Sequence, residues 1–180
     1  GQYNGSCSTG VIIGTNAAAN TTLGTVDSIA TVVIGTNAAS ASLNHRNSVI
    51  VGAYAGQNCS SNQSVYVGAY AGQNVSGSRN VRIGWEAGKD LNAGYRLVIE
   101  SEDTIAAAGV NALIYGEFDN RVLRFGANTV KVQKDLILED DQTPASASAI
   151  GTTGMIRWDA NYIYVCTATN TWKRVAIATW

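Results

Sequence analysis

Few side chains in this 180-residue sequence could perform acid–base or nucleophilic chemistry. The single histidine, His45, stands in the stretch LNHRN and would have to serve as the base of any hydrolytic triad. Glycoside hydrolysis needs two carboxylates about 5–10 Å apart, and two acidic clusters occur, Glu100-Glu102-Asp103 and Glu139-Asp140-Asp141. Both clusters lie where regular structure is expected to end, so solvated turns are the simpler interpretation. For His45 we expect a loop position or a contact between chains, and we therefore predict that the protein is not an enzyme.

Sequence motifs for metals, phosphates and cofactors are absent. Residues 139–141 lack the alternating ligands and glycine of a calcium loop, and neither the G-G-x-G-x-D calcium repeat nor the G-x-x-x-x-G-K-[ST] phosphate loop occurs. Cys7, Cys59 and Cys166 are an odd number without zinc or disulfide spacing. We interpret them as small, mostly buried residues. We expect no metal ion and no cofactor.

Charge and hydropathy also exclude some partners. The formal net charge is −1, which gives no electrostatic reason to bind nucleic acid. No apolar stretch of about 18 residues is present, so we expect no membrane insertion. The opening GQYNGSC has neither the charged nor the apolar region of a secretory signal. It also lacks an initiator Met, which is consistent with a processed chain or a part of a longer one.

Aromatic and cationic side chains near the C-terminus form the best binding candidates. They are Trp158, Tyr162, Tyr164, Trp172, Lys173, Arg174 and Trp180. Aromatic and Arg side chains are favoured at binding hot spots, so this group could stack sugar rings or dock a protein receptor. The alternative is that most of these side chains form the core of a small module and its interface with identical chains.

The elements that would position these residues are written as a repeat. VIVGAYAGQN at residues 49–58 returns as VYVGAYAGQN at residues 65–74. Alignment on V-x-[IV]-G gives repeat glycines spaced by 21, 17, 16 and 16 residues, at Gly14, Gly35, Gly52, Gly68 and Gly84. The 16-residue register continues to Glu100 and then to Gly116. About seven units at such a period are typical of stacked coils.

Each unit predicts the same kind of coil. V-x-[IV] places two apolar side chains on one face of a short strand, and stacked coils would join these faces into a continuous core. The glycine follows where the backbone turns sharply or approaches a neighbour closely. Apolar residues do not recur at helical spacing. We predict an all-β protein with a β-roll or β-solenoid over residues 1–116.

The pattern changes after Gly116. Residues 117–141 predict a β-shaft of three short strands, at 121–125, 130–132 and 136–138. Residues 142–154 contain the only proline and a Ser/Ala run, which indicates a linker. Residues 155–180 predict an antiparallel β-meander with strands at 155–158, 162–167 and 172–177. Three such strands are marginally stable by themselves, which favours packing against a partner, most simply the same module of another chain.

Charged side chains are sparse in the first quarter of the chain. Before Arg46 the only one is Asp27, and charged residues make up 14% of the sequence, against roughly 25% in an average soluble domain. A solvated monomer surface normally carries more charge. We expect this part to pack against copies of itself or among other subunits.

Three passages of the sequence resemble known families. V-x-I-G-x-x-A-G with NVRIGWEAGKDLNAGYRLVIESED, followed by ALIYGEFDNRVLRFGANTVKV, resembles the repeat-to-shaft passage of phage tail-fibre and tail-fibre-like proteins. The V-x-I-G repeats are also similar to the β-roll heads of trimeric autotransporter adhesins. The closing GTTGMIRWDANYIYVCTATNTWKRV resembles a small β-module at the ends of phage virion proteins. The resemblance implies a parallel, intertwined homotrimer, whose small residues let three backbones approach closely.

These observations lead to one hypothesis and two alternatives. The hypothesis is a non-enzymatic structural protein of the phage virion, a trimeric spike or fibre held by other virion proteins. Its C-terminal module would bind a glycan or protein receptor on the host surface. The first alternative is a bacterial surface adhesin or a secreted binding solenoid. The second is an ice-binding solenoid, which Thr at one position of every coil would indicate, and the sequence does not show this recurrence.

Overall fold

The computed structural model is all-β and describes residues 9–20, 29–42, 45–101, 112–139 and 142–179. Contacts divide the chain into two compact units, residues 1–130 and 131–180. Within the described ranges no helix is long and apolar enough to cross a membrane.

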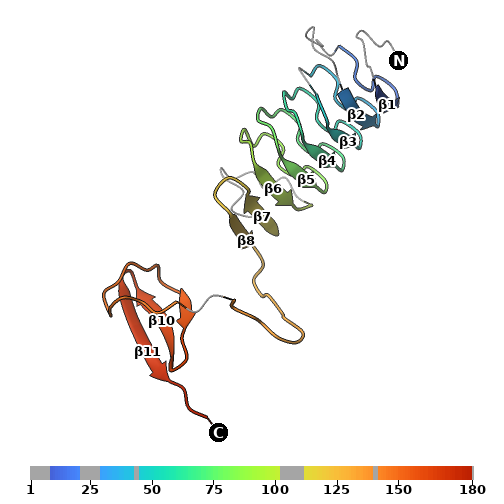
Figure 1. Ribbon diagram of the computed structural model, residues 1–180. Coiled ribbons are helices and arrows are strands. Elements are labelled where there is room, and N and C mark those ends of the chain that lie inside the picture. The colour runs from blue at the N-terminus through green and yellow to red at the C-terminus, as the bar shows by residue number, and fades with distance from the viewer. Residues whose placement is uncertain (1–8, 21–28, 43–44, 102–111, 140–141, 180) are drawn as a thin grey trace. The chain divides into compact units, whose positions relative to one another are not determined.

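The first unit is a β-solenoid, as the repeat predicts (Figure 1). One eight-stranded sheet contains its strands in sequence order. Six strands pair in parallel, each from a successive coil: β1 (Thr9–Ile13), β2 (Ile29–Ile34), β3 (Val49–Val51), β4 (Val65–Val67), β5 (Val81–Ile83) and β6 (Arg96–Ile99). The last two strands, β7 (Ile114–Glu117) and β8 (Val122–Phe125), are antiparallel.

The coil repeat ends one unit earlier than the sequence pattern predicts. β7 runs antiparallel to β6, so Gly116 lies opposite Leu97 in a returning strand. The five earlier repeat glycines have φ between 122° and 137°, and each faces the backbone of the next coil. Gly116 is not at positive φ. It packs against the Leu97 side chain instead, so the apolar residue and glycine that LIYG shares with V-x-[IV]-G do not make it a member of the repeat.

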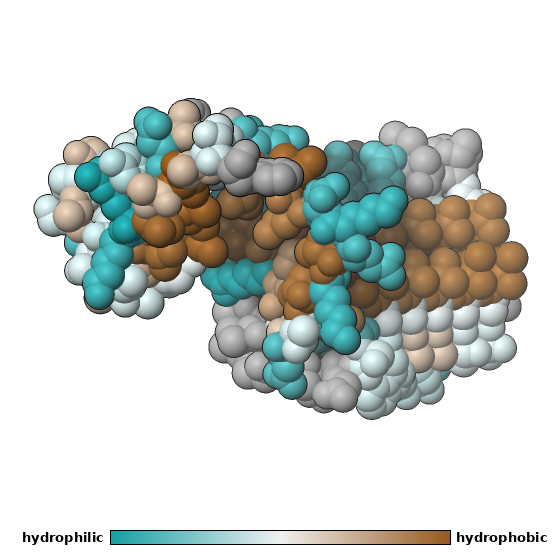
Figure 2. All heavy atoms as spheres, turned by 90° about the horizontal axis from the view of Figure 1, so that it is seen from below, coloured by the Kyte–Doolittle hydropathy of each residue, from teal (hydrophilic) through white to brown (hydrophobic). Residues whose placement is uncertain are grey.

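The two apolar residues of each V-x-[IV] strand face outward, which contradicts the predicted core. The middle residue points inward, and Ile50, Tyr66 and Arg82 are each 0% exposed. The flanking residues form a continuous apolar band along the coils (Figure 2), with Val11 47% and Ile13 57% exposed. Alternation shows that two side chains share a face, but it does not reveal which face is inside.

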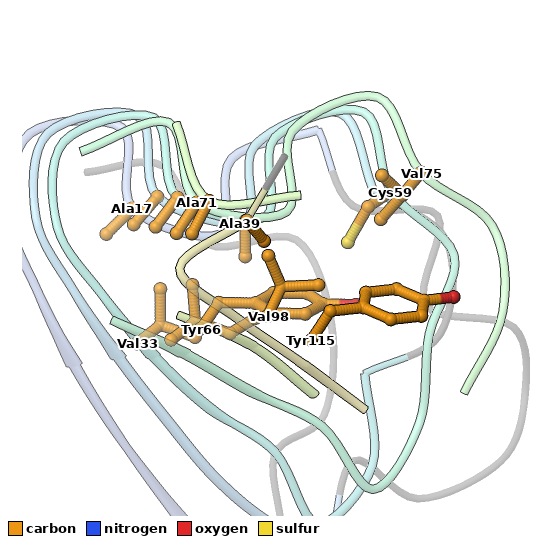
Figure 3. Close-up of a cluster of buried hydrophobic side chains, with 14 residues drawn as sticks. Ala17, Val33, Ala39, Cys59, Tyr66, Ala71, Val75, Val98 and Tyr115 are labelled. Carbon is orange, nitrogen blue, oxygen red and sulfur yellow. The ribbon is translucent and has the colours of Figure 1, made fainter. Parts of the chain in front are cut away.

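Small residues fill the rest of the narrow interior. Each repeat glycine is followed three residues later by a buried alanine: Ala17, Ala38, Ala55, Ala71 and Ala87. Figure 3 shows Ala17, Ala39 and Ala71 across the interior from Val33, Tyr66 and Val98. The interior therefore admits one larger side chain per strand, which explains why the outward pair cannot also be accommodated.

Buried polar side chains hold neighbouring coils in register. The hydroxyl of Ser48 accepts a hydrogen bond from the Ser64 amide at 3.2 Å, and the hydroxyl of Ser64 accepts one from the Asn80 amide at 3.2 Å. The Asn80 side chain continues the series by accepting from the Arg96 amide at 2.9 Å. Each group accepts a hydrogen bond from a backbone amide in the neighbouring coil. A change in the pairing register of two coils would therefore leave buried amides unpaired.

The buried Arg82 guanidinium binds carbonyl groups at the end of the coil stack. It donates to the carbonyls of Gly88 at 2.5 Å, Leu91 at 2.8 Å and Ala93 at 3.3 Å. We expect Arg82→Met to lower the free energy of unfolding by about 2–4 kcal/mol, because these carbonyls lose a charged donor. Urea unfolding measures the loss. Arg79→Met is the control, because it removes an exposed Arg three residues away in the sequence and should change stability little. An equal loss of stability in the two variants would contradict the role of Arg82.

The predicted β-shaft is formed only in part. Its first strand is β8, whereas residues 130–132 and 136–138 are not strands. The apolar side chains of these two segments are exposed by 43–76%. An extended segment becomes a strand when another strand pairs with it, and the described part of this chain supplies none here.

The second unit contains the predicted three-stranded antiparallel meander. Its strands are β9 (Ile156–Trp158), β10 (Tyr162–Ala168) and β11 (Thr171–Ala176), in the order β11-β10-β9. Residues 142–154, which the sequence suggests as a linker, bond to this sheet. The Trp172 amide donates to the Ala147 carbonyl and the Asn170 amide to the Gly151 carbonyl, both at 2.9 Å.

Candidate binding site

A groove of about 500 Å³ lies in the second unit, between the preceding loop and the sheet. The loop contributes Thr143, Pro144, Ala145, Ser146 and Ala147, and the strands contribute Tyr164, Trp172, Lys173 and Arg174. All four of these strand residues belong to the binding candidates predicted from the sequence. We call this site the loop–sheet groove.

Trp172 is fixed as the floor of the groove. It is 5% exposed, and its indole Nε1 donates a hydrogen bond to the Ala149 carbonyl at 3.0 Å. Cys166, 1% exposed, lies opposite it in the register of β10 and β11. The Arg157 guanidinium lies 5.1 Å from the centre of the Trp172 ring system. Trp172 is therefore a core residue of the module that also lines the groove.

Asp159 organises one wall of the groove. Its Oδ2 accepts hydrogen bonds from the hydroxyls of Tyr164 at 2.6 Å and Thr143 at 2.9 Å. Its Oδ1 accepts from the backbone amides of Asn161 and Tyr162, both at 2.8 Å. These bonds, led by that of Tyr164, lower the pKa of the Asp159 carboxyl to about 2. The carboxylate thus links the loop to β10 through two lining residues.

We predict that Tyr164→Phe raises the pKa of Asp159 toward its ordinary value of about 3.9, because the largest stabilising hydrogen bond is lost. An NMR titration of the Asp159 carboxyl carbon measures the shift. Tyr162→Phe is the matched control, since Tyr162 reaches Asp159 through its backbone amide only. An unchanged pKa in Tyr164→Phe would contradict this assignment.

Arg174 and Lys173 are adjacent but belong to opposite faces of β11. Arg174 pairs with Tyr164 on the groove face, and its guanidinium lies 4.1 Å from the centre of the Tyr162 ring. Lys173 pairs with Val165, so strand alternation directs its side chain to the other face. Both are exposed, and neither forms an ion pair with a carboxylate in the described part of the chain.

The remaining binding candidates lie apart from the groove lining. Trp158 is half-buried, pairs with Ile163 on the opposite face, and donates from Nε1 to the Leu138 carbonyl at 3.1 Å. Tyr162 is half-buried beneath Arg174. Trp180 lies outside the described residues. The structure therefore brings together four of the seven candidates in the groove.

The solenoid interior contains a Cys–His pair that sequence reasoning did not find. His45 lies in a loop between β2 and β3, as expected, but its side chain is 4% exposed and points into the coil, so it makes no contact between chains. Its Nδ1 lies 3.1 Å from the Ser61 carbonyl and its Nε2 lies 3.6 Å from the Cys59 sulfur. Ser61 follows His45 by one 16-residue period, and this spacing was the sequence signal that places the two residues in neighbouring coils.

Burial makes this pair unsuited to nucleophilic chemistry. Desolvation lowers the pKa of His45 to about 4 and raises that of the Cys59 thiol to about 11. Because a carbonyl can only accept, Nδ1 carries the proton, and Nε2 accepts from the neutral thiol. A reactive cysteine requires an accessible thiolate. Cys166 is also free and buried, and Cys7 lies outside the described residues.

The acidic clusters are described only in part. Glu100 Oε1 accepts a hydrogen bond from the Gly88 amide at 3.0 Å, whereas Glu102, Asp103, Asp140 and Asp141 lie outside the described residues. Within the described ranges, no group of three or more His, Cys, Asp or Glu side chains could hold a metal ion.

Two curated relatives are phage proteins. The chain is 31% identical over 88 residues to "Depolymerase, capsule K30/K69-specific" of Klebsiella phage K64-1, a match that covers 48% of this chain and 12% of that protein. It is 58% identical over 36 residues to "Depolymerase 1, capsule K30/K69-specific" of Klebsiella phage K5-2, covering 20% of this chain and 4% of that protein. No family model and no solved structure matches.

The chain is thus homologous in part to Klebsiella phage capsule depolymerases, and its β-solenoid fits a phage tail-fibre-like protein. Phage homologues imply a location in the virion. The prediction of a non-enzymatic protein is contradicted, because depolymerases are enzymes that cleave a polymer. The matched stretches are a small share of both relatives.

Proposed function

We propose that this chain is part of a phage tail depolymerase and engages the capsular polysaccharide of the host bacterium. The observation that carries the proposal is the partial homology to two phage depolymerases that are both named as capsule-specific. The loop–sheet groove supplies a suitable site, because its floor is aromatic and its walls carry hydroxyl and guanidinium groups. Such a mixture of apolar and convergent polar groups is typical of ligand sites.

The test uses the purified chain and capsular polysaccharides of the Klebsiella K30 and K69 types. We expect immobilised chain to retain at least one polysaccharide, measured by biolayer interferometry, and not to retain dextran. Size-exclusion chromatography of the treated polymer then shows whether this chain also shortens it. Failure of a folded chain to bind either capsule would overturn the proposal.

We also propose that three copies of the chain associate in parallel through the apolar band, with other virion proteins holding the assembly. The band consists of the outward residues of β1–β6: Val11, Ile13, Val32, Ile34, Val49, Val51, Val65, Val67, Val81, Ile83, Leu97 and Ile99. No charged side chain interrupts it. At about 4.8 Å per strand it extends over roughly 24 Å, and soluble monomers rarely expose such a continuous apolar surface.

Exposed apolar residues recur in the described parts of both units, which favours a partner that contacts both units. Residues 130–138 expose apolar side chains without a strand partner, and the back of the C-terminal sheet exposes Ile156, Ile163, Val165 and Val175 by 38–60%. A further copy of the same chain, aligned in parallel, offers a matching surface to each part. Closed symmetric assemblies are the commonest oligomers.

Light scattering tests the association. We expect a mass three times 18.8 kDa for the wild-type chain and a shift toward the monomer for Ile83→Lys, which places a charge in the band. Thr36→Lys adds the same charge at an exposed position outside the band and should leave the mass unchanged. A wild-type chain that runs at 18.8 kDa would overturn the trimer.

A further inference from the structure

We propose that the loop–sheet groove selects an acidic sugar, with Arg174 pairing with the sugar carboxylate. This inference rests on the proposed function and specifies which units of a polysaccharide the groove recognises. Its basis is the charge of the lining: the Arg174 side chain on the groove face is cationic, and among the described residues no carboxylate lines the groove.

Asp159 is bonded to two residues of the groove lining, and its acceptor positions are occupied, so it has none left for a hydrogen bond from Arg174. Each of its two oxygens already accepts two hydrogen bonds, from the Tyr164 and Thr143 hydroxyls and from two backbone amides. Arg174 instead rests on the face of the Tyr162 ring, with 4.1 Å between the guanidinium carbon and the ring centre. The Tyr164 hydroxyl can engage one of the five N–H donors of this guanidinium, and the others remain for an anion.

A second arginine strengthens the positive potential of the same sheet face. Arg157 on β9 pairs with Tyr164, which pairs with Arg174 on β11, so one row crosses the sheet as Arg157, Tyr164 and Arg174. Arg157 lies over Trp172 and, like Arg174, forms no ion pair with a carboxylate among the described residues. Two guanidinium groups thus face one fully bonded carboxylate, Asp159.

The shape of the groove favours a sugar over a bare anion. Its floor is Trp172, and its loop wall carries the hydroxyls of Thr143 and Ser146 beside Pro144. The small exposed part of Trp172 offers an apolar contact to a sugar ring, and the hydroxyl groups can exchange hydrogen bonds with ring substituents. Arg adds a planar pair of donors that matches the two oxygens of a carboxylate.

The experiment compares native K30 and K69 capsular polysaccharides with the same polymers after chemical reduction of their carboxylates to alcohols. Binding of the full-length chain is measured by biolayer interferometry at low and at physiological salt. We expect reduction to weaken binding by about tenfold or more, the loss of a charged hydrogen-bonded pair. Equal binding of native and reduced polymers would overturn the acidic-sugar assignment while leaving capsule recognition intact. Binding of neither form would overturn capsule recognition itself.

Two variants test which positive charge binds the sugar carboxylate. Arg174→Gln should reproduce the loss of about tenfold with native polymer and show no further loss with the reduced one. Lys134→Gln removes a positive charge from an exposed position of the same unit that does not line the groove, and should change affinity less than about twofold. Equal losses in both variants would indicate nonspecific attraction and overturn the role of Arg174.

Discussion

Gly68→Ala is expected to unfold the solenoid locally and to lower its free energy of unfolding by about 3 kcal/mol or more. Gly68 has φ near +132°, a region that side chains disfavour. A Cβ there would lie 2.6 Å from the Gly84 carbonyl carbon and closer still to its oxygen. Neighbouring backbones cannot separate without breaking the parallel hydrogen bonds of β4 and β5. Chemical denaturation followed by circular dichroism measures the loss.

Gly56→Ala is the matched control for that substitution. Gly56 also has positive φ, but at +57°, and Ala39 occupies the equivalent position of the preceding coil with φ of 51°. The added Cβ would meet Cδ1 of Ile50 at 3.2 Å and the ring atom Cδ2 of Tyr66 at 3.3 Å. We expect a smaller cost, about 1–2 kcal/mol, which is the cost of the left-handed conformation for an L-residue. A cost for Gly68→Ala no larger than this would show that coil spacing does not require the repeat glycines.

The solenoid is expected to lose stability as the pH falls from about 6.5 to about 4, by about 3 kcal/mol in total. The cause is His45, whose pKa burial lowers to about 4 in the folded chain from 6.5. Within this window the unfolded chain binds a proton that the folded chain does not, so its relative free energy falls. Below about pH 4 both states are protonated and this dependence ends.

Urea unfolding at a series of pH values measures this slope. His45→Gln should flatten the slope between pH 4 and 6.5, since the chain contains no other histidine. Asp159 affects stability at lower pH than His45 does. Its pKa is about 2 in the folded chain, so its stabilisation is lost as the pH falls from its ordinary pKa of about 3.9 toward 2. An equal slope in His45→Gln and the wild type would exclude His45 as the cause.

The sequence predicted the elements of the protein well because their signals are local. Glycines spaced by 16–21 residues marked the strands β1–β5 in their correct order, and the 16-residue register then marked β6. Turn residues around 159–161 and 168–170 marked the terminal meander. The predicted end of the repeat was too late, because LIYG at residues 113–116 has the apolar residues of a strand followed by a glycine, as the repeat units do. Whether that strand continues a coil or returns as a hairpin depends on its partner, which a local pattern does not contain.

The candidate site was predicted in composition but not in geometry. The sequence selected Tyr164, Trp172, Lys173 and Arg174 as chemically able to bind, and the structure brings all four to one groove. The contribution of Thr143 and Ser146 was not foreseen, because residues 142–154 read as a linker. Their place follows from backbone hydrogen bonds to β11, such as that between Trp172 and Ala147.

The sequence by itself determined that this protein is a stack of short strands followed by a small antiparallel sheet, since residue periodicity and turn chemistry act over a few positions. Only the tertiary structure decided which side of each strand is inside. The interior is too narrow for the valine pairs and accepts Ile50, Tyr66 and Arg82, so the apolar pairs form the outer surface. Tertiary stacking likewise decided that His45 is buried against Cys59 and Ser61 from the following coil.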